Sequence, residues 1–217
     1  MQYMERYIES IDWITISLVG CFLIFTFVKY LYPRRFDEFV MLPFNNKYFY
    51  VQGKNDALKH PFNLLLFVSQ VLSVSLLFFF LLNHNNQEIS QTNPWLFVRI
   101  CAAYSLFILM KLLIEKIIAS IFSIEAIANN YLYQKLSYRN LLGMFVFIGN
   151  LLLFYSVEPS RMFIFAFLGF LLILNCFTLF NSYKSFGNAI LNNFFYFILY
   201  LCALEIAPYL ILFKTLQ

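Results

Sequence analysis

The sequence predicts an all-α, polytopic bundle of transmembrane helices, and three observations support this fold class. The 217 residues are 62% hydrophobic and 12% charged, whereas a soluble domain is roughly half apolar and about a quarter charged. The mean hydropathy is +0.73. The apolar residues also fall into runs of about 20 residues, the length that crosses a hydrocarbon core. This composition excludes a soluble domain and a disordered chain, because disorder requires few aromatic residues and much charge.

The apolar runs predict six membrane spans, in chain order. The spans lie at residues 12–32, 62–82, 94–118, 141–157, 161–180 and 189–213. The fourth span is the shortest, and a chain that lacked it would cross the membrane five times. The longest connection, 33–61, is too short to bury a core of its own. We therefore expect residues 1–217 to form a single integral membrane domain.

The basic residues predict the orientation, because Lys and Arg concentrate in cytoplasmic loops. With both termini outside, the cytoplasmic side holds eleven basic residues: Lys29, Arg34, Arg35, Lys47, Lys54, Lys59, Lys111, Lys116, Lys135, Arg139 and Lys184. The outer side holds four: Arg6, Arg99, Arg161 and Lys214. The sequence therefore predicts a bacterial inner-membrane protein whose two termini are periplasmic.

Two segments have the pattern of interfacial amphipathic structure. The connection 33–61 mixes charged residues with large apolar ones, a pattern typical of chain lying in the headgroup region. Its candidate partner or lipid interface consists of Arg34, Arg35, Asp37, Glu38 and Lys47. After the third span, isoleucines recur every three or four residues between 114 and 127, which predicts an amphipathic continuation of that helix.

One stretch carries a family resemblance. Residues 31–49 read LYPRRFDEFVMLPFNNKYF, with Asp12-Trp13-Ile14 before the first span and Phe62-Asn63 at the start of the second. Together they resemble an uncharacterised family of polytopic inner-membrane proteins from Bacteroidota, defined as a domain of unknown function. The resemblance implies the inner membrane of a Gram-negative cell. It transfers no catalytic or binding residue to this chain.

Glu205 is the acidic residue that most needs an explanation, because it lies inside a predicted span and charge there is costly. It is eight residues before Phe213, which places it about 12 Å below the outer end of the sixth span. Arg99 and Arg161 begin the third and fifth spans on the same side. We expect a polar pair between Glu205 and one of these arginines, acting either as a helix-register ion pair or as a proton or ion relay.

Other polar residues within the spans fit structural roles. Lys111 and Glu115 are four residues apart on the third span near the inner interface, where snorkelling of the lysine explains them. Gln70, Asn150 and Asn175 are single amides in separate spans. For these amides we expect interhelical hydrogen bonds, worth about 0.6 kcal/mol each on average.

The sequence offers no signature of an enzyme or a metal site. His60 and His84 fall on opposite sides of the membrane in the predicted topology. The cysteines lie singly in apolar runs without paired spacing: Cys21, Cys101, Cys176 and Cys202. Neither zinc-peptidase nor nucleotide-binding motifs occur. We expect no catalytic residues, no cofactor, no metal and no nucleic-acid partner.

Three functions remain, in decreasing order of support. The first is a non-catalytic inner-membrane subunit or assembly factor of an envelope complex, such as one for protein secretion or motility. Its partners would be membrane lipids and other integral membrane proteins, or further copies of itself. The second is a small proton- or ion-coupled transporter or channel centred on Glu205. The third is a lipid-modifying enzyme that uses the connection 33–61 as its platform.

Overall fold

The computed structural model describes residues 12–43, 48–49, 60–85, 94–121, 125–155 and 161–192, and the elements in these ranges are helices. In chain order they are α1 (Asp12–Leu31), α2 (Pro33–Val40), α4 (Pro61–Asn85), α5 (Pro94–Ile121), α6 (Glu125–Tyr155) and α7 (Arg161–Asn192). Four of them have stretches long and apolar enough to cross a membrane: Asp12–Leu31, Pro61–Leu82, Trp95–Ile121 and Asn129–Tyr155. Met162–Thr178 in α7 is a shorter apolar helix. The predicted fold class is thereby confirmed.

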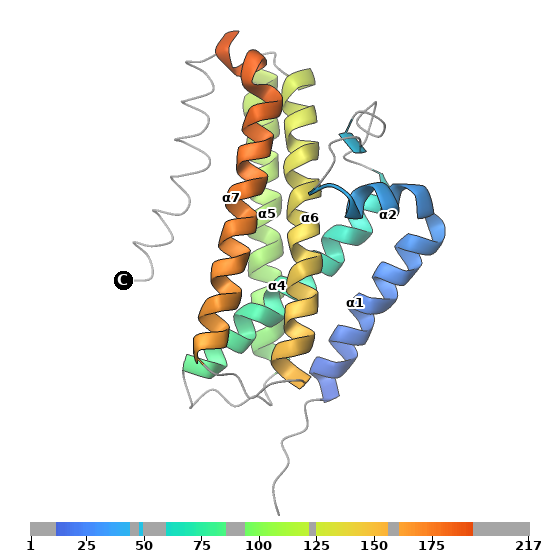
Figure 1. Ribbon diagram of the computed structural model, residues 1–217, viewed down its shortest axis with the longest axis vertical. Helices are drawn as coiled ribbons and strands as arrows, with labels where there is room; N and C mark the ends of the chain where they lie inside the picture. The colour runs from blue at the N-terminus through green and yellow to red at the C-terminus, as the bar shows by residue number, and fades with distance from the viewer. Residues whose placement is uncertain are drawn as a thin grey trace, which may run out of the picture.

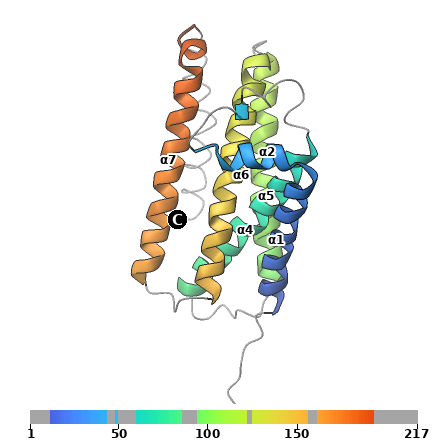
Figure 2. The ribbon, with the colours of Figure 1, turned by 45° about the vertical axis from the view of Figure 1, so that its right-hand side comes forward.

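Helix α4 lies at the centre of the bundle and packs against α1, α5 and α6. Helix α7 packs on α6 and stands at one edge, while α1 stands at the other (Figures 1 and 2). The short helix α2 follows α1 directly and lies across the bundle against α6. We call the end of the bundle that carries α2 the α2 end.

The close packing of α4 depends on small residues. Ser69 and Ser73 are fully buried and face Cys21 of α1, whose Sγ lies 3.9 Å from the Ser73 hydroxyl. On α6, a Cβ atom added to Gly143 would lie 2.9 Å from the Cα of Gln70. Because small side chains let helix backbones approach closely, this pattern is the usual basis of helix association in membranes.

Three predicted spans agree with the helices to within three residues at each end, namely 12–32, 62–82 and 94–118. Helix α6 differs, because it begins at Glu125 and not near residue 141. Its first half contains polar residues that lie outside the predicted span 141–157, yet Tyr133, Gln134 and Ser137 are buried in the structure. Helix α7 also continues to Asn192, into the range predicted for the sixth span, most of which lies outside the described residues.

Large apolar side chains face outward along the bundle, as expected for contact with lipid. On α1, α5 and α7 they include Ile16, Phe22, Leu106, Leu113, Phe165 and Leu172. Such an apolar surface would be an aggregation hazard in water. Together with the length of the helices, it supports a membrane location.

Candidate functional site at the α2 end

Helix α2 is a short amphipathic helix whose sequence explains both its start and its orientation. Pro33 is at the first turn, where proline fixes φ without removing a needed hydrogen bond. Phe36 and Phe39 are three residues apart and both are buried. Arg34 and Asp37 are exposed, while Arg35 and Glu38 are partly exposed. The helix therefore presents a charged face on a fixed apolar base.

Aromatic rings hold this helix against the rest of the bundle. The ring of Phe39 lies 6.1 Å from that of Tyr48, which stacks on Tyr133 of α6 at 5.8 Å. Phe49 lies 5.4 Å from Tyr138, five residues further along α6. Aromatic pairs at such distances add about 0.5–1.5 kcal/mol each beyond the area they bury. We call these five residues the α2 layer.

His60 contacts Tyr32, which lies between α1 and α2, and the start of α4. Its Nδ1 accepts a hydrogen bond from the backbone N–H of Phe62 at 3.2 Å, and its ring meets Tyr32 edge-on at 5.1 Å. Burial, and secondarily the positive charge of Arg35, lowers the pKa of His60. Burial likewise raises the pKa of the Tyr48 phenol. Both groups are therefore neutral at pH 7, so the charge at this end of the described chain is carried by other side chains.

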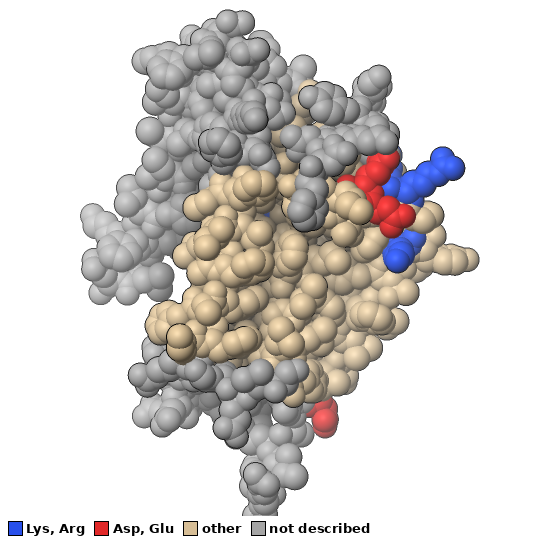
Figure 3. Space-filling view, viewed as in Figure 1, with Lys and Arg blue, Asp and Glu red and all other residues tan. Residues whose placement is uncertain are grey.

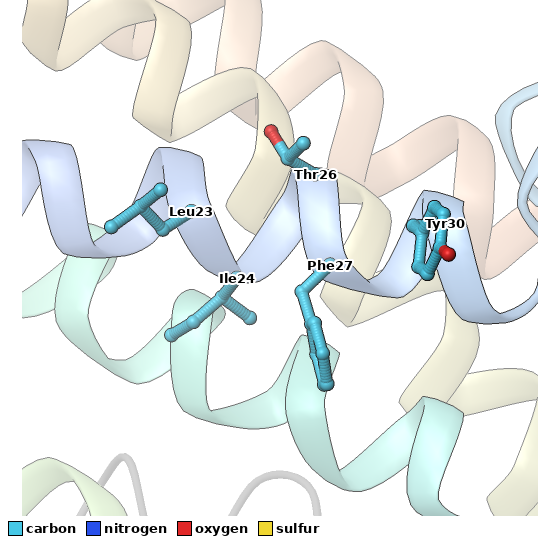
Figure 4. Close-up of a pocket in the computed structure, with 5 residues that line it drawn as sticks. All are labelled: Leu23, Ile24, Thr26, Phe27 and Tyr30. Carbon is cyan, nitrogen blue, oxygen red and sulfur yellow. The ribbon is translucent and has the colours of Figure 1, made fainter.

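Charged side chains gather at α2 in Figure 3, above a wide uncharged surface. Next to them, a groove of about 510 Å³ on α1 is lined by Leu23, Ile24, Thr26, Phe27 and Tyr30. Ile24 and Phe27 point toward α4, and Thr26 points to the other side of α1 (Figure 4). The lining is almost entirely apolar, so the groove suits a lipid chain or an apolar helix.

An ion pair that the sequence analysis missed joins α5 to α6. Lys135 Nζ donates to Glu115 Oε1 at 2.9 Å, and the Glu115 side chain is fully buried while that of Lys135 is 19% exposed. Lys135 also lies over the ring of Tyr131, 5.5 Å from its centroid. Snorkelling was predicted for Lys111 alone, and no interhelical partner was predicted for Glu115. That partner is 20 residues further along the chain, where no local spacing indicates it.

The buried amides of α4 and α6 hold the helices together as predicted. Gln70 Nε2 donates to the Tyr104 hydroxyl of α5 at 2.8 Å, and Asn150 Nδ2 donates to the Ser73 carbonyl at 2.7 Å. Among the described residues, Gln70 Oε1, Asn150 Oδ1 and both amide atoms of Asn140 have no hydrogen-bond partner. Each such atom costs about 1–3 kcal/mol if it stays unpaired. Asn175 differs from the other amides, because it is exposed on α7.

The structure leaves the predicted Glu205 pair as a prediction. Glu205 and Lys47 lie outside the described residues. Arg99 is exposed on α5, and Arg161 is the first residue of α7, at the same end of the bundle. Among the residues described, no three His, Cys, Asp or Glu side chains come together in a way that could hold a metal ion.

Comparison with known proteins identifies a family. The chain belongs to the family described as domain of unknown function (DUF4271), whose model matches residues 14–216. No curated protein and no solved structure matches the chain. Membership of this family agrees with the resemblance of residues 31–49 to a family of unknown function. Any activity must therefore be argued from the geometry.

Proposed function

We propose that this member of the family is a non-catalytic subunit or assembly factor of an envelope complex in the inner membrane of a Bacteroidota cell. Both termini are periplasmic in this proposal, so the α2 end faces the cytoplasm. The observation that carries the proposal is the charged face of α2, which Phe36 and Phe39 fix on the α2 layer. A fixed surface of this kind is suited to docking, because little conformational freedom is lost when a partner binds.

The charge pattern of α2 favours a protein partner over anionic lipid. Two arginines are followed by two acidic residues within five positions, so the net charge of the segment is zero: Arg34, Arg35, Asp37 and Glu38. Binding to anionic lipid gains about 1 kcal/mol per basic residue near the surface, and the acidic neighbours oppose that gain. A partner surface with charges of both signs matches this face, and electrostatic complementarity of this kind sets specificity. We place the partner among integral membrane proteins or further copies of this chain.

Site-specific photocrosslinking tests the proposal in the native membrane. A photoreactive residue replaces Asp37, which is exposed on α2, and in a matched control replaces Phe165, which is exposed on the apolar face of α7. We expect Asp37 to give a discrete protein adduct and Phe165 to give lipid adducts. Lipid adducts alone at both positions would contradict a docking role for α2.

Cysteine labelling tests the proposed orientation. Asp12 is the first residue of α1, and Asp37 lies in α2, which follows the other end of α1. Both residues are exposed. A membrane-impermeant thiol reagent added to intact spheroplasts should label Asp12→Cys and leave Asp37→Cys unlabelled until the cells are lysed. The reverse pattern would invert the topology and remove α2 from the cytoplasmic face.

A further inference from the structure

Helix α7 exposes an amide side chain within its apolar stretch. Asn175 lies in the segment Met162–Thr178, three residues before its end. The side chain of Asn175 is exposed, whereas those of Gln70, Asn140 and Asn150 are almost fully buried between helices. Asn175 is therefore the amide of these four that faces the surroundings of the bundle.

The packing of α7 against α6 gives the depth of Asn175. A Cβ atom added to Gly149 would meet the ring of Phe167. Gly149 is six residues before the end of α6, and Phe167 is six residues after the start of α7, so residues equally far from the connection lie side by side. Asn175 is 14 residues after the start of α7 and is therefore level with about Leu141. That level is about 21 Å from the end of α6, inside a hydrocarbon core of about 30 Å.

The Asn175 amide differs from exposed hydroxyl groups in other helices, which bond to their own backbone. The Thr26 hydroxyl donates to the Phe22 carbonyl at 3.0 Å, and the Ser105 hydroxyl donates to the Ala102 carbonyl at 3.0 Å. Within the described part of the chain, the side chain of Asn175 makes no hydrogen bond. Hydrocarbon offers no water to replace that bond, so an amide at this depth needs a partner on another helix.

We propose that Asn175 is the contact point between two copies of this chain, whose α7 helices cross at this residue. Copies inserted in the same orientation carry Asn175 at the same depth. An amide is complementary to a second amide, because the partial positive charge of its NH2 group matches the partial negative charge of the other oxygen. A two-fold axis along the membrane normal therefore pairs the two side chains reciprocally, as polar residues commonly do between membrane helices.

This contact leaves the α2 face free. Helix α7 stands at the edge of the bundle opposite α1 (Figures 1 and 2), so a pair of chains presents two α2 faces on the same side of the membrane. Phe165 is ten residues from Asn175, or about 15 Å, where crossing helices have diverged and lipid surrounds the side chain. The proposal does not depend on the docking role of α2.

Oxidative crosslinking in native membranes tests the contact. Leu172 is one turn before Asn175 and is 67% exposed, and Ile16 on α1 is 71% exposed. In a chain whose four cysteines are replaced by alanine, Leu172→Cys should give a disulfide-linked dimer with copper phenanthroline, and the control Ile16→Cys should not. Adding Asn175→Leu to Leu172→Cys should remove most of the dimer. Equal crosslinking at both positions, or none at Leu172→Cys, would overturn the proposal.

Energy transfer between labelled copies measures the dissociation constant of the dimer in vesicles of phosphatidylethanolamine and phosphatidylglycerol. We expect Asn175→Leu to raise that constant about tenfold, the effect of an interhelical hydrogen bond in model peptides. Asn175→Gln keeps the amide and should stay near the wild-type value, as should the control Thr26→Leu. A dissociation constant unchanged by Asn175→Leu, or a wild type that stays monomeric, would refute the contact. An Asn175→Leu chain that no longer folds would place the amide's partner within the same chain and refute it too.

Discussion

Helix α6 carries two polar arrangements, one charged and one neutral. Toward α5, Lys135 Nζ donates to Glu115 Oε1 at 2.9 Å, while Glu115 Oε2 has no hydrogen-bond partner among the described residues. Toward α4, Asn140 and Asn150 are neutral, and in the described chain three of their four side-chain polar atoms lack a hydrogen-bond partner. Both arrangements therefore leave buried polar atoms unpaired within the described residues, and they differ in the charge that they bury.

Depth in the bundle accounts for this difference. Lys135 is 20 residues from Tyr155, the last residue of α6, so it lies about 30 Å from that end, the thickness of a hydrocarbon core. Its 19% exposure is consistent with a place at the boundary. Asn140 and Asn150 lie deeper, where a charge is much more costly than a neutral amide. A neutral amide is therefore the polar group that is buried at lower cost at this depth.

The largest loss of stability is expected when one member of the Glu115–Lys135 pair is replaced and the other is kept. Glu115→Leu leaves the Lys135 ammonium partly buried without its carboxylate, so it should lower the free energy of unfolding by about 3 kcal/mol. Glu115→Leu/Lys135→Leu should recover most of that loss, because apolar side chains replace a buried pair at little cost. Denaturant titration in detergent measures both, with the exposed Lys116→Leu as control. A double variant as unstable as the single one would show that the pair is needed for more than mutual neutralisation.

Gly143→Ala disturbs the contact between α4 and α6 by steric overlap. The added Cβ would lie 2.9 Å from the Gln70 Cα and 2.6 Å from its Cγ, so α4 must move, at a cost of about 1–3 kcal/mol. Gly169→Ala on α7 is the control, because no neighbouring atom lies within 4 Å of its added Cβ. Its stability should stay the same or rise by up to about 1 kcal/mol. Equal effects at the two glycines would mean that α4 and α6 are not closely packed.

Tyr104→Phe tests how much the hydrogen bond of the Gln70 amide contributes to stability. The change removes the acceptor of the 2.8 Å hydrogen bond, with an expected loss of about 0.6 kcal/mol, the average for an interhelical bond in a membrane protein. Tyr155→Phe removes a bond to Thr15 that is exposed, and so should cost less. Unfolding midpoints compare the two variants, and a larger loss at Tyr155 would argue against a buried network around Gln70.

The smallest expected effect is a pH dependence at His60. Its pKa in the folded chain is lowered from the ordinary value of 6.5 by burial, then by Arg35. As the pH falls below 6.5, His60 binds a proton in the unfolded chain before it does so in the folded chain. The free energy of unfolding therefore decreases as the pH falls from 6.5 toward the folded pKa. Protonation also turns Nδ1 from acceptor to donor and removes the cap on Phe62. Unfolding midpoints from pH 8 to 5.5 should fall less in His60→Gln, and identical slopes would exclude His60 as the source.

Helices were easier to predict from this sequence than the contacts between them. Hydropathy predicted α1, α4 and α5 closely, because a lipid-facing helix must be apolar over about 20 residues. It missed the first half of α6, whose polar residues Gln134 and Ser137 are buried by protein and not by lipid. It identified Arg34 and Asp37 as interfacial, and the structure shows them exposed on α2. Their partner and the Glu205 pair remain predictions.

The sequence by itself determined that this chain is helical, which segments are apolar enough to cross a membrane, and where its amphipathic segment lies. These properties depend on the hydropathy and spacing of residues that are consecutive in the chain, so the sequence alone is enough to predict them. The tertiary structure decided that Glu115 pairs with Lys135 of α6, and that Gln70 meets Gly143. Such choices depend on the turn between helices and on their crossing, which bring together residues far apart in the chain. Two helices of similar hydropathy can therefore make different side-chain contacts, depending on which helices pack against them.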